Sequence, residues 1–182
     1  MRIIGGRYQR RLINPPPGLP VRPTTDKAKE ALFNILHNHF DFETVRVLDL
    51  FSGTGSISFE FASRGAEEVV AIEKNYQCVR FMNKVKQELD LNNLNVIKSD
   101  VFRFLEWCKT PYDIIFADPP YNMQQTKMLP DLVFDRKLLL DDGWLIIEHP
   151  SEFVFDNHAQ FLRKRKYSRV HFSFFGFNKS IQ

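Results

Sequence analysis

Apolar and polar positions alternate with two different periods from residue 45 onward, and they predict strands and helices in turn. Short runs rich in β-branched and aromatic residues predict buried strands over residues 45–50, 69–72, 95–98, 112–117 and 144–148. Between them, apolar residues three and four positions apart predict helices over residues 56–63, 76–91, 101–108 and 128–140. The longest helix should turn Cys78, Met82, Val85 and Leu89 inward. Strands alternating with helices predict an α/β fold with a doubly wound, mostly parallel, Rossmann-like sheet.

The two ends of the chain depart from this alternation. Residues 161–167 and 170–177 predict a hairpin that gives the sheet an antiparallel edge. Residues 1–13 predict a small β-ribbon with a turn at Gly5-Gly6, and residues 14–23, with five of the ten prolines, predict an extended connector. A helix capped by Thr24 or Thr25 follows. Its predicted buried face holds Ala28, Ala31, Leu32, Ile35 and Leu36. We therefore divide the chain into a ribbon and connector, residues 1–23, and a Rossmann-like domain, residues 24–182.

The composition predicts a soluble globular protein. Hydrophobic residues make up 43% of the chain and charged residues 26%, and no apolar run approaches the roughly 18 residues that a membrane span needs. The only cysteines, Cys78 and Cys108, are too few for a disulfide framework, so we expect reduced thiols in a cytosolic protein. His37 and His39 face apart on a helix, so we expect no metal site.

Positive charge is concentrated at the two ends of the chain. The formal net charge is +3, but residues 1–30 hold seven basic side chains against two acidic ones. A second basic run, residues 163–166, lies beyond the last acid, Asp156. Nucleic acid is the partner that such an asymmetry favours, although runs of charge are also common on ordinary solvated surfaces.

Four acidic residues follow the predicted strands. Asp49, Glu73, Asp100 and Asp118 each stand within two residues of the end of one strand. Ligands of open α/β sheets bind outside the carboxyl ends of the strands, where the strand order reverses. Any one of these acids could be a helix cap or a solvated loop residue, but all four in the same register predict one acidic rim.

A glycine loop after the first strand predicts where a cofactor binds. Gly53 and Gly55 allow a tight turn, and the helix that follows offers free N–H groups to a carboxylate or phosphate. Ser58 stands where the dinucleotide motif has its third glycine, and Asp49 would repel a pyrophosphate. A cationic cofactor is favoured instead, and S-adenosylmethionine carries a sulfonium and an ammonium. Glu73 lies twenty residues after Gly53, which is the spacing of an acid that binds the ribose hydroxyls in a nucleoside-binding βαβ unit.

The chain is organised around the stretch Asp118-Pro119-Pro120-Tyr121. Prolines cannot donate a backbone hydrogen bond, so the turn presents a carboxylate and a carbonyl oxygen as acceptors beside an aromatic ring. A planar group that carries an NH2, such as a nucleobase, would fit this arrangement. Asp100 could accept from the amino group of the cofactor's adenine, with Val101 and Phe102 against its ring.

These motifs resemble those of class I S-adenosylmethionine-dependent methyltransferases. The N-terminal stretches Arg2-Ile3-Ile4-Gly5-Gly6 and Arg22-Pro23-Thr24-Thr25-Asp26, with Glu30 and Leu32-Phe33-Asn34, narrow the resemblance to the RsmD-type family. One departure is Ser168, where that family often has glycine, and His149 receives no role.

The resemblance implies methylation of the 2-amino group of a guanine in 16S ribosomal RNA, free or in a small-subunit assembly particle, by a cytoplasmic monomer. The implied catalytic residues are Asp118, Pro119 and Tyr121. The implied cofactor-binding residues are Asp49, Phe51, Ser52, Gly53, Gly55, Glu73, Asp100 and Val101. The implied RNA-binding residues are Arg7, Arg10, Arg11, Arg22 and Thr24.

Two alternatives stay open at the level of the sequence. A DNA adenine- or cytosine-amino methyltransferase would share the chemistry, but it would need a target-recognition domain, for which 182 residues leave no room. A nucleotide- or RNA-binding protein without catalysis is the other. A covalent cysteine route is disfavoured, because Cys78 falls on an apolar helix face and Cys108 has no adjacent base.

Overall fold

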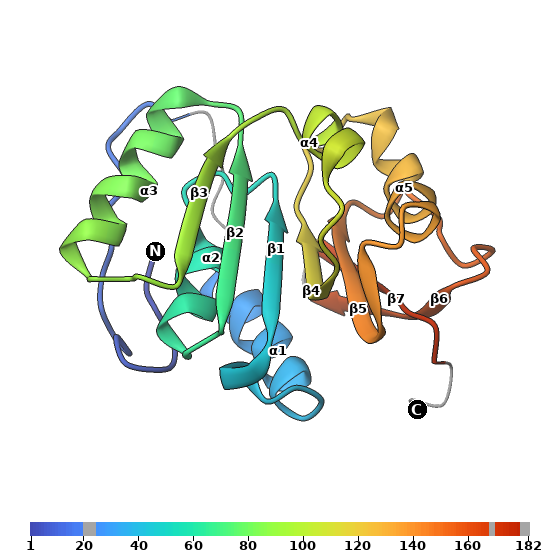
Figure 1. Ribbon diagram of the computed structural model, residues 1–182, viewed down its shortest axis with the longest axis horizontal. Coiled ribbons are helices and arrows are strands. Elements are labelled where there is room, and N and C mark those ends of the chain that lie inside the picture. Colours follow the sequence, from blue (N-terminus) through green and yellow to red (C-terminus); the bar gives the residue numbers. More distant parts are fainter. Residues whose placement is uncertain (20–24, 168–169, 179–182) are drawn as a thin grey trace.

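The protein folds around one seven-stranded sheet, which Figure 1 shows with helices on both faces. The computed structural model describes residues 1–19, 25–167 and 170–178. The strands are β1 Arg46–Leu50, β2 Glu68–Glu73, β3 Leu94–Lys98, β4 Tyr112–Ala117, β5 Leu139–His149, β6 Phe161–Tyr167 and β7 Val170–Phe175. The helices are α1 Asp26–His37, α2 Ser56–Ser63, α3 Tyr76–Glu88, α4 Val101–Trp107 and α5 Leu129–Asp135, with 3-10 helices η1 Phe42–Thr44 and η2 Gln124–Met128.

The strand order is β3-β2-β1-β4-β5-β7-β6. The first five strands pair in parallel, whereas β7 runs antiparallel to both β5 and β6. The predicted Rossmann-like fold with an antiparallel edge hairpin is therefore confirmed. The chain order reverses between β1 and β4, and this reversal opens the crevice in which α/β sheets bind ligands.

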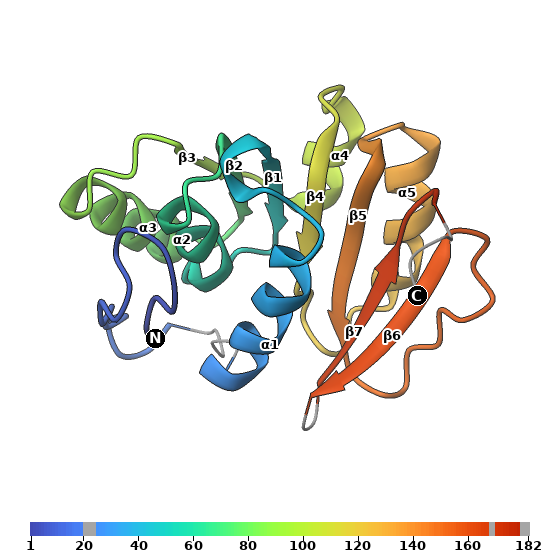
Figure 2. The same cartoon turned by 90° about the horizontal axis from the view of Figure 1, so that it is seen from below.

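Alternate residues of the strands build two cores. Val47, Val69 and Ile114 face the core beneath α1, α2 and α3, whereas their neighbours Leu48 and Val70 face the core beneath α4 and α5. Figure 2 shows these two groups of helices on opposite sides of the sheet. Because the strands are buried on both faces, they read in the sequence as nearly continuous apolar runs.

Most predicted elements lie within a few residues of the observed ones. Thr25 caps α1, and its hydroxyl accepts from the backbone N–H of Ala28 at 3.3 Å. The four inward positions predicted for α3 are all buried. Thr24 and Ser168 lie outside the described residues. Within the described part of the chain, no helix is both long and apolar enough to cross a membrane.

The helix predicted over residues 128–140 is wrong in its second half. The α-helix ends at Asp135, and Lys137 takes a left-handed conformation, φ 55°, that turns the chain back toward the sheet. Leu139 then pairs with Tyr112 of β4, so β5 begins five residues earlier than predicted. The leucines at this point have helical spacing, and only the neighbouring strand decides that they extend the sheet.

The N-terminal ribbon is reduced to one bridge between Arg2 and Leu12. The segment 1–13 closes on itself where Met1 and Ile13 exchange backbone hydrogen bonds of 2.9 and 3.0 Å. It is anchored to α2, because the Glu60 carboxylate accepts from the backbone N–H groups of Ile4 and Gly5, each at 2.8 Å.

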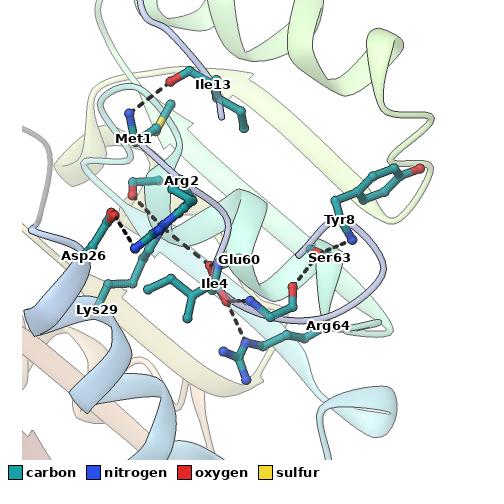
Figure 3. A network of polar contacts seen from close by, with 12 residues as sticks. Met1, Arg2, Ile4, Tyr8, Ile13, Asp26, Lys29, Glu60, Ser63 and Arg64 are labelled. Carbon is teal, nitrogen blue, oxygen red and sulfur yellow. Dashed lines mark hydrogen bonds and ion pairs between the residues drawn. The ribbon is translucent and has the colours of Figure 1, made fainter. Parts of the chain in front are cut away.

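A buried ionic network joins this segment to α1 and α2, and Figure 3 shows it converging on Glu60. Lys29, which is 1% exposed, donates to the Arg2 carbonyl at 2.6 Å and to Ser56 Oγ at 3.3 Å, and its Nζ lies 3.5 Å from Glu60. Arg64 adds a contact of 2.8 Å to the same carboxylate. Burial lowers the pKa of Lys29, and the charge of Glu60 opposes that shift.

We expect Glu60→Gln to lower the free energy of unfolding by about 2 to 3 kcal/mol, because it leaves the buried Lys29 ammonium without its counter-charge. Urea denaturation measures the change. Glu88→Gln is the matched control, because Glu88 forms an exposed ion pair with Lys84 on α3, and its effect should stay within about 0.5 kcal/mol. Equal effects of the two changes would contradict the anchoring role of Glu60.

Candidate active site

A cavity of about 520 Å³ lies at the carboxyl ends of β1 to β4. Four acids at the ends of these strands line it, namely Asp49, Glu73, Asp100 and Asp118. The cavity is also lined by Phe51, Ser52, Gly53, Val101, Pro119 and Tyr121. The structure thus brings one acidic wall, one glycine loop and one aromatic turn to a single opening.

The glycine loop is fixed by its own backbone geometry. Gly53 and Gly55 both have positive φ, 54° and 81°, and Gly55 caps α2. A Cβ atom on Gly55 would lie 2.9 Å from the side chain of Met82, so α2 and α3 leave space only for glycine. Gly55 shapes the turn from behind and does not line the cavity.

Glu73 is held in one orientation by the loops around it. One carboxylate oxygen accepts from the N–H of Gly53 at 2.8 Å, and the other accepts from the N–H of Asn75 at 2.7 Å. The side chain is 8% exposed and lines the cavity. Because each carboxylate oxygen has a second lone pair, Glu73 can still accept from two neighbouring hydroxyl groups of a ribose.

Asp49 is the most deeply buried acid of the site. It is 2% exposed, and the hydroxyl of Ser58 donates to it. Burial, and secondarily the charge of Glu73, raise the pKa of Asp49 to about 7. Ser58, which stands where the dinucleotide motif has its third glycine, thus forms a hydrogen bond with Asp49 instead. A bound cation would lower the pKa again and stabilise the ionised form.

Asp100 combines two contacts at the far end of the cavity. One of its oxygens caps α4 by accepting from the N–H groups of Phe102 and Arg103, at 3.0 and 3.3 Å. Val101 lines the cavity beside it, whereas the ring of Phe102 packs against that of Phe51 with centroids 6.2 Å apart. Phe51 and Val101 thus place apolar groups in the cavity next to the Asp100 carboxylate, whereas Phe102 does not line it, and this combination suits a flat heteroaromatic ring with an amino group.

The Asp118 turn closes the opposite end of the cavity. The backbone N–H of Asp118 donates to the Leu50 carbonyl at 3.4 Å, which fastens the turn to β1. Burial, then the charges of Glu148 and Asp49, raise the pKa of Asp118 well above its ordinary value. Tyr121 is 44% exposed at the rim, so its ring is accessible to a planar group that approaches from outside.

Of the predicted RNA-binding arginines, the three that the structure describes, Arg7, Arg10 and Arg11, do not line this cavity. The backbone N–H of Arg7 donates to the carbonyl of Ser63, at the end of α2 remote from the glycine loop. Arg11 lies beside α3, around a separate hollow that Phe81 also lines. The backbone N–H of Arg10 donates to the Ile3 carbonyl within the N-terminal segment. Arg22 and Thr24 lie outside the described residues. Their contact with RNA stays a prediction.

Several groups in and around the site carry no signal of their own in the sequence. Ser56, Asn75 and Ser99 line the cavity, because they sit in the same loops as the acids. His149 is buried, with its ring nitrogens 2.7 Å from Ser173 Oγ and 2.8 Å from the Pro150 carbonyl, and it joins β5 to the neighbouring strand β7. Burial raises the pKa of Cys78, the reverse of what an activated thiol nucleophile needs.

Comparisons with known proteins match the chain over nearly its whole length. The family described as Conserved hypothetical protein 95 matches residues 1–176. Ribosomal RNA small subunit methyltransferase D of Escherichia coli (strain K12) is 34% identical over 152 residues, 84% of this chain and 76% of that protein. The protein of the same name from Buchnera aphidicola subsp. Baizongia pistaciae is 28% identical over 179 residues, 96% of this chain and 91% of that protein. Among solved structures, yhhF from Escherichia coli superposes with a TM-score of 0.85 and 27% identity, covering 96% of each chain.

Proposed function

The chain belongs to the Conserved hypothetical protein 95 family, the RsmD-type methyltransferases, and from this premise we propose that it methylates the 2-amino group of a guanine in 16S ribosomal RNA. S-adenosylmethionine is the methyl donor. The substrate is the RNA itself or a small-subunit assembly particle, and the enzyme acts in the cytoplasm as a monomer. The observation that carries the proposal is the single cavity in which Asp49, Glu73 and Asp100 face Asp118.

The acidic wall suits S-adenosylmethionine better than a phosphorylated cofactor. Three carboxylates, on β1, β2 and next to β3, line one side of the cavity. They attract an ammonium and a sulfonium and repel a pyrophosphate. In the proposal Glu73 accepts from the ribose hydroxyls, Asp100 and Val101 hold the adenine, and the start of α2 faces the carboxylate.

The Asp118 turn supplies what a poorly nucleophilic amine needs. The lone pair of an exocyclic amino group is delocalised into the base, so the nitrogen reacts only once that lone pair is localised. When bound, S-adenosylmethionine would supply an electrophilic methyl group, and its sulfur would keep the electron pair of the broken C–S bond. Asp118 and the Pro119 carbonyl accept hydrogen bonds from the two N–H groups of the amine. This arrangement aims the nitrogen lone pair at the methyl group and stabilises the positive charge that develops on nitrogen. The nitrogen then loses one proton, which Asp118 or water takes up. Tyr121 stacks on the base.

We expect cofactor affinity to depend on the ionisation of Asp49. Its pKa is about 7, and a cation binds the ionised form better than the protonated one. Below the pKa the bound proton must be released first, so the dissociation constant should rise about tenfold from about pH 8 to about pH 6. Calorimetric titration at both pH values measures it. Asp49→Asn should flatten the profile, apart from a residual slope due to Asp118, and equal wild-type affinity at both values would contradict the link.

Methyl transfer to defined nucleic acids tests the proposal. The protein is incubated with methyl-labelled S-adenosylmethionine and either 16S ribosomal RNA, small-subunit particles or duplex DNA, and the product nucleosides are separated. We expect label in N2-methylguanosine from one of the ribosomal substrates and none from DNA. Label in N6-methyladenine or N4-methylcytosine of DNA would identify a DNA amino-methyltransferase. Binding of RNA without any transfer would identify a non-catalytic binding protein.

A further inference from the structure

Glu148 stands beside Asp118 at the end of the neighbouring strand. The parallel pairing of β4 with β5 aligns Ala117 with Ile147, so Asp118, directly after the end of β4, stands next to Glu148 of β5. Neighbouring strands lie about 4.8 Å apart, and aligned residues point to the same face. Glu148 is 6% exposed, so its carboxylate is held inside the protein next to the Asp118 turn.

The electrostatics of Asp118 agree with this proximity. After burial, Glu148 has the largest effect in raising the pKa of Asp118, ahead of Asp49. A like charge has such an effect only at short range inside a protein. Register and charge therefore both indicate a buried pair of carboxylates.

The position of this pair agrees with the side from which a base must approach. The cofactor-binding wall of the cavity comes from β1, β2 and the loop after β3, so the cofactor fills the space on that side of Asp118. The sheet continues from β4 to β5 on the other side. Glu148 is not among the residues that line the cavity, so a base would have to reach its carboxylate by entering between Asp118 and β5.

Guanine differs from the other amino-bearing bases at this edge. Beside its 2-amino group it carries the N1–H donor, whereas in adenine and cytosine the ring nitrogen beside the amino group is an acceptor. A carboxylate accepts hydrogen bonds and repels a second acceptor, so a buried carboxylate at this position selects guanine.

We propose that Glu148 is a specificity-determining residue that accepts the N1–H of the target guanine while Asp118 accepts from its 2-amino group. The inference rests on the proposed function and adds to it a physical basis for the choice of base. A carboxylate has enough lone pairs to accept from guanine in addition to partners within the protein.

The test replaces the target guanine by 2-aminopurine, which keeps the 2-amino group but has an acceptor at N1. In a synthetic RNA methylated by the wild-type enzyme, we expect kcat/KM to fall about 100-fold or more on this replacement, because the buried carboxylate then faces an acceptor. The amide of Glu148→Gln can donate to N1 of 2-aminopurine. In this variant the ratio of kcat/KM for guanine over 2-aminopurine should therefore fall to about tenfold or less. Asp141→Asn, at the exposed start of the same strand, is the control and should leave the preference unchanged.

Each outcome separates the inference from the proposed function. If the wild-type enzyme forms no N2-methylguanosine, the proposed function fails. If it does, but uses 2-aminopurine within about threefold of guanine, the role of Glu148 is overturned without any variant. An unchanged preference in Glu148→Gln overturns it as well. Should Glu148→Gln fail to fold, as judged by its melting temperature and cofactor affinity, Glu148→Ala takes its place, and a guanine preference equal to that of the wild-type enzyme then overturns the role.

Discussion

Replacing Asp118 by alanine is expected to lower kcat for methyl transfer by about 1000-fold or more, since it removes the acceptor that stabilises positive charge on the reacting nitrogen. The dissociation constant of S-adenosylmethionine should change no more than a few-fold. The reason is spatial, because Asp118 closes the end of the cavity away from Asp100 and Glu73, which hold the nucleoside in the proposal. Single-turnover kinetics separates the chemical step from binding.

Two further variants make the result for Asp118 specific. Asp118→Asn keeps the size of the side chain and an acceptor oxygen but loses the charge, so its kcat should lie between those of the alanine variant and the wild type. Asp135→Ala, on the exposed end of α5, is the matched control and should retain full turnover. Undiminished turnover in Asp118→Ala would contradict the role of the turn in accepting the amine.

Replacing Glu73 by alanine is expected to weaken S-adenosylmethionine binding by about 100-fold or more, because two hydrogen bonds to a charged acceptor are lost, each contributing about 1.5 to 3 kcal/mol. The loss has a second source in the loop itself. The N–H groups of Gly53 and Asn75 lose their partner, so the loops that shape the cavity are no longer held together. Equilibrium dialysis with labelled cofactor measures the change.

The control for Glu73 lies at the opposite end of its strand. Glu67 is exposed just before β2, and Glu67→Ala should leave cofactor binding unchanged. Glu73→Gln separates the two sources of the loss, since the amide can still accept one backbone N–H while it lacks the charge. Cofactor affinity in Glu73→Ala equal to that of the wild-type protein would show that the ribose lies elsewhere.

The ends of the strands that build the site can be predicted from the sequence. Pro119 and Pro120 stop β4 after Ala117, and the glycines after β1 fix the turn into α2, so local chemistry decides both boundaries. Burial on both faces makes each strand readable as an apolar run. The placement of four acids at one opening then follows from the rule that ligands bind at the carboxyl ends of parallel strands.

Contacts between distant elements cannot be predicted in this way. Lys29 lies among the charged positions of α1 and reads as a solvated residue, yet it is buried because Glu60 of α2 and the Arg2 carbonyl meet it there. Leu139 has helical spacing and joins β5 because Tyr112 is its neighbour. Glu148 acquires its position beside Asp118 only through the register of two strands 30 residues apart. Each depends on pairing that no single segment encodes.

The most direct test of the central claim is a mass-spectrometric map of modified nucleosides in small-subunit ribosomal RNA from cells with and without this protein. We expect one N2-methylguanosine to disappear when the protein is removed, and to return when the wild-type chain, but not Asp118→Ala, is supplied. An unchanged set of N2-methylguanosines after removal of the protein would contradict the proposed substrate.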